Sequence, residues 1–256
     1  MDAFGRVGTG GTLRRAFVAG ALILTVLTAG VSCKRIIALV KKPPPPTFNR
    51  PRVDAALAKI SEKIQEDPKF IELIKRGPQA SNGEKLDLAF KPNSGYQDIG
   101  AQLAAKGMAR LSPVEFLQQV KLKLKMAEKL PKLCAGFWSG GVSIADLGEG
   151  LDSLSDSEIE RWFELANRAT HLELYATTPL PRFSGQVMTD GIRQIAAALP
   201  PAESQAFVAT MQQGVGAPPA AGCLAYQQLT RGGLALPDAQ RDTFLRGLSF
   251  DKLVDW

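Results

Sequence analysis

The feature that most constrains the fold of this chain is a helix-start signal that recurs four times from residue 107 onward. Gly107–Phe116 and Gly150–Ile159 both read glycine, large apolar residue, two variable residues, leucine, serine, two variable residues, glutamate, large apolar residue. Leu199–Glu203 and Leu236–Gln240 echo the second part of this pattern. Serine followed three residues later by glutamate is a capping box, in which each side chain satisfies a free backbone N–H at a helix start. The pattern therefore predicts four helix starts.

Counted between their leucines, these starts are 43, 45 and 37 residues apart, which leaves room for a helical hairpin in each interval. Upstream, Val53–Glu66 carries apolar residues at helical spacing, and Pro68 begins a shorter helix. Gly77–Ser94 is polar and predicts a surface loop, in which Leu86–Phe90 alternates as a short strand does. The sequence contains no strand-rich block, so the predicted class is all-α. We expect a compact helical bundle of repeated helical hairpins, carrying an N-terminal membrane anchor.

The anchor is predicted from a targeting pattern at the N-terminus. Two arginines precede an apolar run, Ala16–Ser32, that ends at Cys33. A basic region, an apolar core and small residues before a cleavage site make up a secretory signal. With its terminal cysteine the segment resembles a bacterial lipoprotein signal, with Gly30 where a large aliphatic residue is usual. The resemblance implies that residues 1–32 are the signal, that Cys33 is lipidated, and that the body faces the periplasm.

A second interpretation of this segment is an uncleaved transmembrane helix. The run Ala16–Ser32 is at the short end of the roughly 17–25 residues needed to cross a bilayer. Lysine and arginine flank both of its ends, and the downstream side carries more of them. By the positive-inside rule, that excess would hold the rest of the chain in the cytoplasm. We prefer export with a lipid on Cys33, because a cysteine at this junction is otherwise a coincidence.

The segment after the signal predicts a spacer between membrane and folded body. Residues 33–52 are basic and proline-rich, and four consecutive prolines, Pro43–Pro46, favour an extended polyproline II conformation. The basic residues can lie against anionic lipid headgroups. We therefore divide the remaining chain into an N-terminal helical pair and loop at 53–94 and a helical repeat domain at 95–256.

Charge is distributed unevenly along the chain. Residues 1–52 hold nine of its 31 Lys and Arg and one of its 25 acidic residues, whereas 53–256 hold 22 bases and 24 acids. Nucleic-acid binding needs a basic face, so this slightly acidic body argues against a nucleic-acid partner. One local exception is a helical stripe formed by Lys121, Lys125, Lys129 and Lys132. Lys123 lies beside it. Such a stripe is usually a solvated face, and an acidic protein partner is the alternative.

Two further cysteines, Cys134 and Cys223, remain if Cys33 carries the lipid. An even pair in an oxidising compartment predicts a disulfide. It would close a loop of about 90 residues and stabilise the fold by about 4–5 kcal/mol in the chain-entropy model. The alternative is two separate core residues, since free cysteine is often fully buried. Export would favour the disulfide, and retention in the cytoplasm would favour two separate core cysteines.

The sequence offers little for catalysis or metal binding. The single histidine, His171, supplies neither a triad nor a ligand set, and the glycine-rich pieces Phe137–Gly141 and Gly214–Gly216 lack a phosphate-loop lysine. The pairs Glu203-Ser204 and Met211-Gln212 are similar to fragments of lytic transglycosylases, which cleave peptidoglycan with a single glutamate acid. The resemblance implies an acid at Glu203-Ser204, whereas the repeated pattern indicates a capping glutamate there. No catalytic residue, metal site or cofactor is predicted.

Together these features predict a membrane-tethered protein of the bacterial cell envelope that binds another protein without chemistry of its own. Inhibitor, immunity factor and assembly partner are all compatible roles. The anchor, the proline spacer and helices able to present grooves motivate this hypothesis, and the lysine stripe is the candidate partner-binding surface. The alternatives are an architectural envelope lipoprotein and a transglycosylase-like peptidoglycan enzyme.

Overall fold

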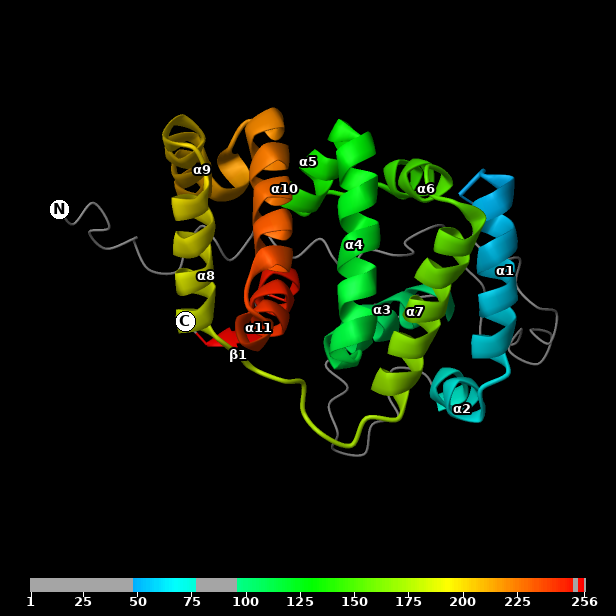
Figure 1. Cartoon of the computed structure of the whole chain (residues 1–256). Helices are drawn as coiled ribbons and strands as arrows, with labels where there is room; N and C mark the ends of the chain where they lie inside the picture. Colours follow the sequence, from blue (N-terminus) through cyan, green and yellow to red (C-terminus); the bar gives the residue numbers. More distant parts are fainter. Residues whose placement is uncertain (1–47, 77–95, 251–252, 256) are drawn as a thin grey trace.

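The computed structural model describes residues 48–76, 96–250 and 253–255 (Figure 1). The predicted signal, Cys33, the tether up to residue 47 and the loop with its short strand lie outside the described residues. Those predictions are therefore neither confirmed nor contradicted. Within the described ranges, no helix is long and apolar enough to cross a membrane.

Eleven α-helices dominate the described chain, so the predicted all-α class is confirmed. They are α1 (Pro51–Gln65), α2 (Pro68–Arg76), α3 (Tyr96–Gly107), α4 (Pro113–Lys129), α5 (Pro131–Ser139), α6 (Ile144–Asp152), α7 (Asp156–Leu174), α8 (Gly185–Ala198), α9 (Pro201–Gln213), α10 (Pro219–Ala235) and α11 (Asp238–Ser249). Two 3-10 turns, η5 (Met108–Arg110) and η6 (Gly214–Gly216), and two short strands, β1 (Phe183–Ser184) and β2 (Val254–Asp255), complete the order. The strands pair in parallel and join the end of the described chain to the start of α8.

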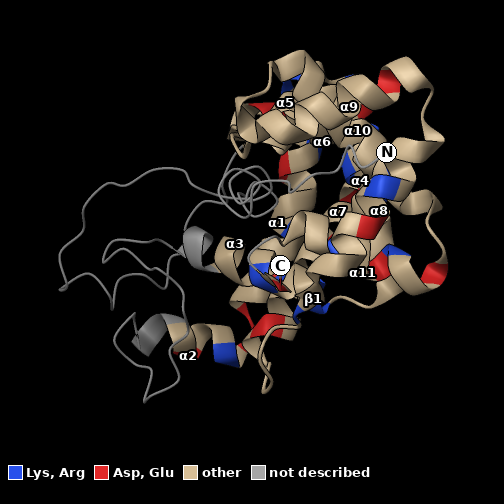
Figure 2. Cartoon of the chain, turned by 90° about the vertical axis from the view of Figure 1, so that its left-hand side faces the viewer, with Lys and Arg blue, Asp and Glu red and all other residues tan. Residues whose placement is uncertain are grey.

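Five of the longer helices stand side by side in the order α8, α10, α4, α7 and α1 (Figure 1). Against this layer, α5 contacts α10, α3 contacts α7, and α11 contacts α8 and α10. One continuous hydrophobic core runs from α1 to β2, and a smaller cluster of Phe70 and Leu103 joins α2 to α3. Acidic and basic residues are interspersed on the side of the molecule seen in Figure 2. The layer of helices defines the faces on which a site can form.

The predicted helix starts are found at all four positions, but only two are capping boxes. At α4 the Ser112 hydroxyl accepts from the Glu115 backbone N–H, and the Glu115 carboxylate accepts from the Ser112 N–H at 3.0 Å. Ser155 and Glu158 make the same reciprocal pair at α7. The leucines before the two serines, Leu111 and Leu154, are buried in the core.

The capping role predicted for Glu203 is wrong. The N-cap of α9 is Pro200, with no side-chain cap hydrogen bond. Proline has no hydroxyl to accept from the helix and no N–H to donate to a glutamate, so a reciprocal box cannot close there. α11 likewise begins behind a proline, Pro237, without a side-chain cap. These two starts therefore depend on the fixed backbone angle of proline and on tertiary contacts.

Arg246 fixes α11 to the segment before α4. The residue is 4% exposed, and its guanidinium donates to the carbonyl oxygens of Ala109 at 3.0 Å and Leu111 at 2.7 Å. The Asp242 carboxylate accepts from the same group at 2.8 Å, and the guanidinium lies 4.4 Å from the centroid of the Phe116 ring. A buried cation is tolerated because its donors are satisfied and its charge is paired. This contact joins positions more than 130 residues apart.

Candidate binding groove between helices α4, α10 and α11

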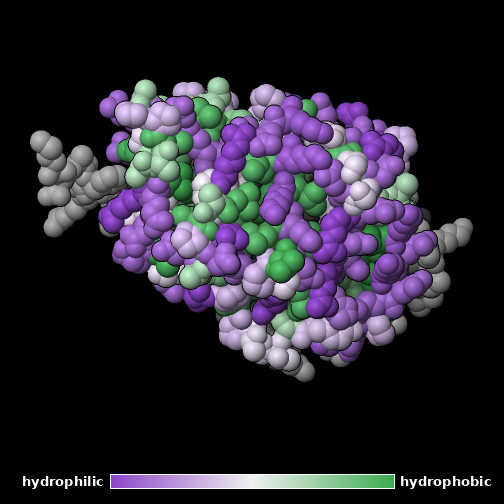
Figure 3. Space-filling model, in the orientation of Figure 1, coloured by the Kyte–Doolittle hydropathy of each residue, from purple (hydrophilic) through white to green (hydrophobic). Residues whose placement is uncertain are grey.

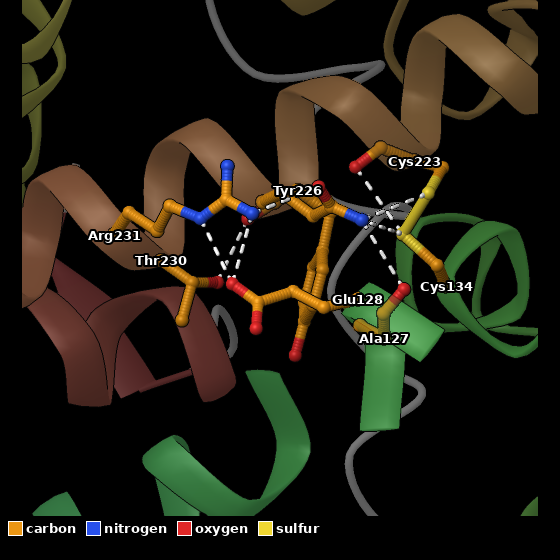
Figure 4. Close-up of a disulfide and its surroundings, with 8 residues drawn as sticks. Ala127, Glu128, Cys134, Cys223, Tyr226, Thr230 and Arg231 are labelled. Atoms are coloured by element: carbon orange, nitrogen blue, oxygen red, sulfur yellow. Dashed lines mark hydrogen bonds and ion pairs between the residues drawn. A yellow bond between two sulfur atoms is a disulfide. The ribbon is translucent and has the colours of Figure 1, made fainter. Parts of the chain in front are cut away.

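A disulfide between Cys134 of α5 and Cys223 of α10 borders the candidate site (Figure 4). It spans 89 residues of sequence, and both cysteines are buried. The Gln227 side chain, one turn further along α10, donates to the Ala127 carbonyl of α4 at 3.1 Å and lies 3.6 Å from both sulfurs. The predicted pairing of the two cysteines is present in the structure. Together these contacts hold α4, α5 and α10 at fixed positions.

The close approach of α5 to α10 requires a glycine. A Cβ on Gly222 would lie 2.3 Å from Cδ1 of Trp138, which is closer than any real carbon contact. The Trp138 indole N–H donates to the Gly214 carbonyl at 2.9 Å, so the ring cannot move aside without losing that bond. The disulfide and this aromatic contact therefore form one rigid junction beside the groove.

A cavity of about 40 Å³ opens between α4, α10 and α11. Apolar side chains form most of its lining, from Val120, Phe137, Leu229, Leu245 and Leu248. Four polar side chains complete it, from Lys123, Tyr226, Thr230 and Ser249. In the view of Figure 3, hydrophobic side chains gather on the face between α10 and α4. We call this cavity and its rim the central groove.

Lys123 is the charged residue of the central groove. It is half-buried between apolar side chains, and burial lowers the pKa of its ammonium group to about 8. Among the described residues it makes no ion pair and no hydrogen bond. A desolvated cation without a counter-charge is costly, because water no longer stabilises it and the protein does not replace water. A carboxylate placed in the groove would supply the missing counter-charge.

Tyr226 is the neighbouring titratable group in the groove. Burial raises the pKa of its phenol above the usual value of 10, so it stays neutral wherever Lys123 titrates. Its ring contacts that of Phe137, with centroids 5.5 Å apart. The Thr230 hydroxyl donates to the Tyr226 carbonyl at 2.8 Å. The groove thus combines an apolar wall, one unpaired cation and neutral hydroxyl groups.

From the sequence, Lys123 was placed only beside the lysine stripe, although its spacing on α4 distinguishes it. Val120, Lys123 and Ala127 are spaced by three and four residues, so they share one face of α4. Val120 and Ala127 are both buried. A lysine in register with the apolar face was therefore a signal that could have singled out Lys123, whereas the residues of α10 and α11 that line the cavity with it could not be predicted from the sequence.

The predicted lysine stripe is divided and largely engaged within the chain. α4 ends at Lys129, and Lys132 lies on α5, because Pro131 begins a new helix. The prediction that all four lysines lie on one helix is therefore wrong for Lys132. Lys132 pairs with Asp146 at 2.8 Å, and Lys129 donates to the Ser153 carbonyl.

Lys125 and Lys121 are the other members of that stripe. Lys125 pairs with both carboxylate oxygens of Glu158, at 2.6 and 2.8 Å. This hydrogen bond, followed by those from Ser155, lowers the pKa of Glu158 to about 2. Lys121 is exposed and has no partner among the described residues. A partner for the stripe stays a prediction, and its binding would compete with three intramolecular contacts.

The residues considered for chemistry lie at the surface. His171 is exposed, stacks on the Tyr175 ring at 4.4 Å and has its Nε2 3.8 Å from Asp67. Glu203 is exposed on α9 and accepts a hydrogen bond from Gln228 at 3.4 Å. Within the described ranges, no group of three or more His, Cys, Asp or Glu side chains is placed to hold a metal ion.

Comparisons of the chain with protein-family models, with curated proteins and with solved structures found no match. We therefore infer function from the residues of this chain and from their geometry.

Proposed function

We propose that this chain is a membrane-tethered protein of the bacterial cell envelope whose helical body binds another protein through the central groove. Its role is that of an inhibitor, immunity factor or assembly partner, without catalysis of its own. The N-terminal apolar run and Cys33 supply the tether, and the proline-rich segment holds the body away from the membrane surface. The body faces the periplasm.

The observation that carries this proposal is the unpaired lysine in an apolar groove. Among the described residues no acidic side chain pairs with Lys123, which lines an apolar cavity, and a buried charge without a counter-charge does not stabilise the fold. Apolar grooves between helices accept side chains from a partner helix or loop. The groove therefore has the composition of a recognition site, with an apolar floor and a single charge that sets specificity.

The disulfide supports the proposed compartment. Disulfides persist in oxidising environments such as the bacterial periplasm and are rare in the cytosol. The Cys134–Cys223 bond lies in the core and borders the groove. A body placed in the cytoplasm by the positive-inside rule would have these cysteines reduced. The cross-link is therefore an argument for export.

The test is affinity capture from envelope extracts with the full-length chain in mild detergent. Ser249→Trp places a large ring at the half-buried edge of the groove, and Gln205→Trp places the same ring on the exposed face of α9. We expect one specific partner to be captured by the wild type and by Gln205→Trp, and to be lost with Ser249→Trp. Equal capture by all three, or recovery of no partner, would contradict groove-mediated binding and favour an architectural role.

A further inference from the structure

We propose that the central groove is a carboxylate-recognition site, which takes one aspartate or glutamate side chain of the partner onto Lys123. The inference rests on the proposed function and specifies the chemistry of the bound group. No acidic side chain lines the cavity within the described part of the chain. The other residues that line the cavity with Lys123 are apolar or carry hydroxyl groups, so a bound carboxylate would be the first counter-charge in this lining.

The position of Lys123 separates it from the other lysines of α4. Lys125 and Lys129 lie over α7 and the turn before it, where Glu158 and a backbone carbonyl already accept from them. Lys121 is exposed to solvent, where a bound carboxylate would gain little over water. Lys123 alone among these four lies in the cavity, where a low local dielectric strengthens an ion pair.

The size of the cavity limits the occupant. A volume of about 40 Å³ is enough for roughly three water-sized groups. The carboxylate group of an acidic side chain, with its three non-hydrogen atoms, matches this size, whereas a lipid chain or a nucleotide exceeds it. Tyr226 and Ser249 belong to the same lining and carry hydroxyl groups that can donate to a second carboxylate oxygen, whereas the Thr230 hydroxyl already donates to the Tyr226 carbonyl. The cavity therefore fits an acidic side chain that projects from an otherwise apolar segment of the partner.

Propionate serves as the probe, with propionamide as its neutral counterpart of the same shape. The full-length chain in detergent micelles, labelled in its lysine side chains, is titrated with each at constant ionic strength. NMR resonances are assigned through Lys123→Met and Lys121→Met. We expect a saturable shift of the Lys123 resonance with propionate and a rise in its pKa, because a bound carboxylate favours the charged amine. The Lys121 resonance should show no saturable shift with propionate. Neither lysine resonance should show one with propionamide.

A Lys123 resonance that does not respond to propionate, or that responds equally to propionamide, overturns the carboxylate site. The capture experiment separates this failure from failure of the proposed function. If capture of the partner is lost in Ser249→Trp but persists in Lys123→Met, the partner binds at the groove but is not recognised through the lysine. Propionate binding to a chain that captures no partner would leave the carboxylate site standing and reject protein binding.

Discussion

Replacing Lys123 with methionine should make the protein more stable at neutral pH. Methionine is unbranched like lysine and one atom shorter, and it carries no charge that burial can penalise. Burial lowers the pKa of Lys123 from 10.5 to about 8, which corresponds to at most about 3 kcal/mol. Solvent that reaches this half-buried side chain reduces the figure. We expect Lys123→Met to raise the free energy of unfolding by about 1–3 kcal/mol at pH 7.

The sign of this effect fixes its pH dependence. Between pH 8 and 10.5 the unfolded chain binds the lysine proton while the folded chain has released it, so stability rises with pH in that window. Below pH 8 the lysine is charged in the folded chain, and the full free-energy cost of burying that charge is present. The advantage of Lys123→Met should therefore shrink to less than about 1 kcal/mol by pH 10, where the wild-type lysine is neutral when folded.

The assay is urea unfolding of the full-length chain in detergent, followed by circular dichroism at pH 7 and pH 10. Lys121→Met is the matched control, because that side chain is exposed on the same helix. Its stability should differ from wild type by less than about 0.5 kcal/mol at both pH values. If Lys123→Met is no more stable than wild type at pH 7, Lys123 is not an unpaired, desolvated charge. The same conclusion would follow if the gain in stability persisted unchanged at pH 10.

Three further changes test the scaffold that positions the groove, each by the same unfolding assay. Arg246→Met removes a buried cation and leaves its carbonyl acceptors unpaired, so a loss of about 3–5 kcal/mol is expected; a cost below 1 kcal/mol would contradict that contact. Gly222→Ala forces a carbon against the Trp138 ring and should cost about 1–3 kcal/mol, and unchanged stability would show that the helices separate freely. Glu158 has its pKa lowered to about 2 by Lys125 and Ser155, so its stabilising contribution is present above pH 4.5 and is lost as pH falls to 2. Glu158→Gln should flatten this acid dependence, and an unaltered acid profile would exclude Glu158 as its source.

Local sequence signals predicted the helices because they act over a few residues. Ser112 and Glu115, like Ser155 and Glu158, close capping boxes whose partners are three residues apart. The same reasoning failed at α9, where proline occupies the N-cap and lacks the groups that the box requires. Helix starts were therefore predictable at all four positions, whereas the interactions that stabilise them were predicted correctly only at α4 and α7.

Contacts between distant segments could not be predicted in the same way. Arg246 binds carbonyl groups before α4, and sequence periodicity carries no information on such a pairing. The disulfide was predictable from cysteine count and compartment, whereas its position beside a groove was not. Lys123 was recognisable on the apolar face of α4, but the absence of a counter-charge depends on the side chains that α10 and α11 bring to it.

The thiol state of Cys134 and Cys223 in intact cells tests whether the helical body is exported and cross-linked, on which the proposed function rests. Cells are quenched in acid, free thiols are alkylated, disulfides are reduced, and the new thiols are alkylated with a heavier reagent before mass spectrometry. We expect both cysteines to carry the heavier label and unreduced digests to contain the Cys134–Cys223 linked peptide. Both cysteines carrying the first label would contradict this expectation, because an exported body would not keep these neighbouring thiols reduced.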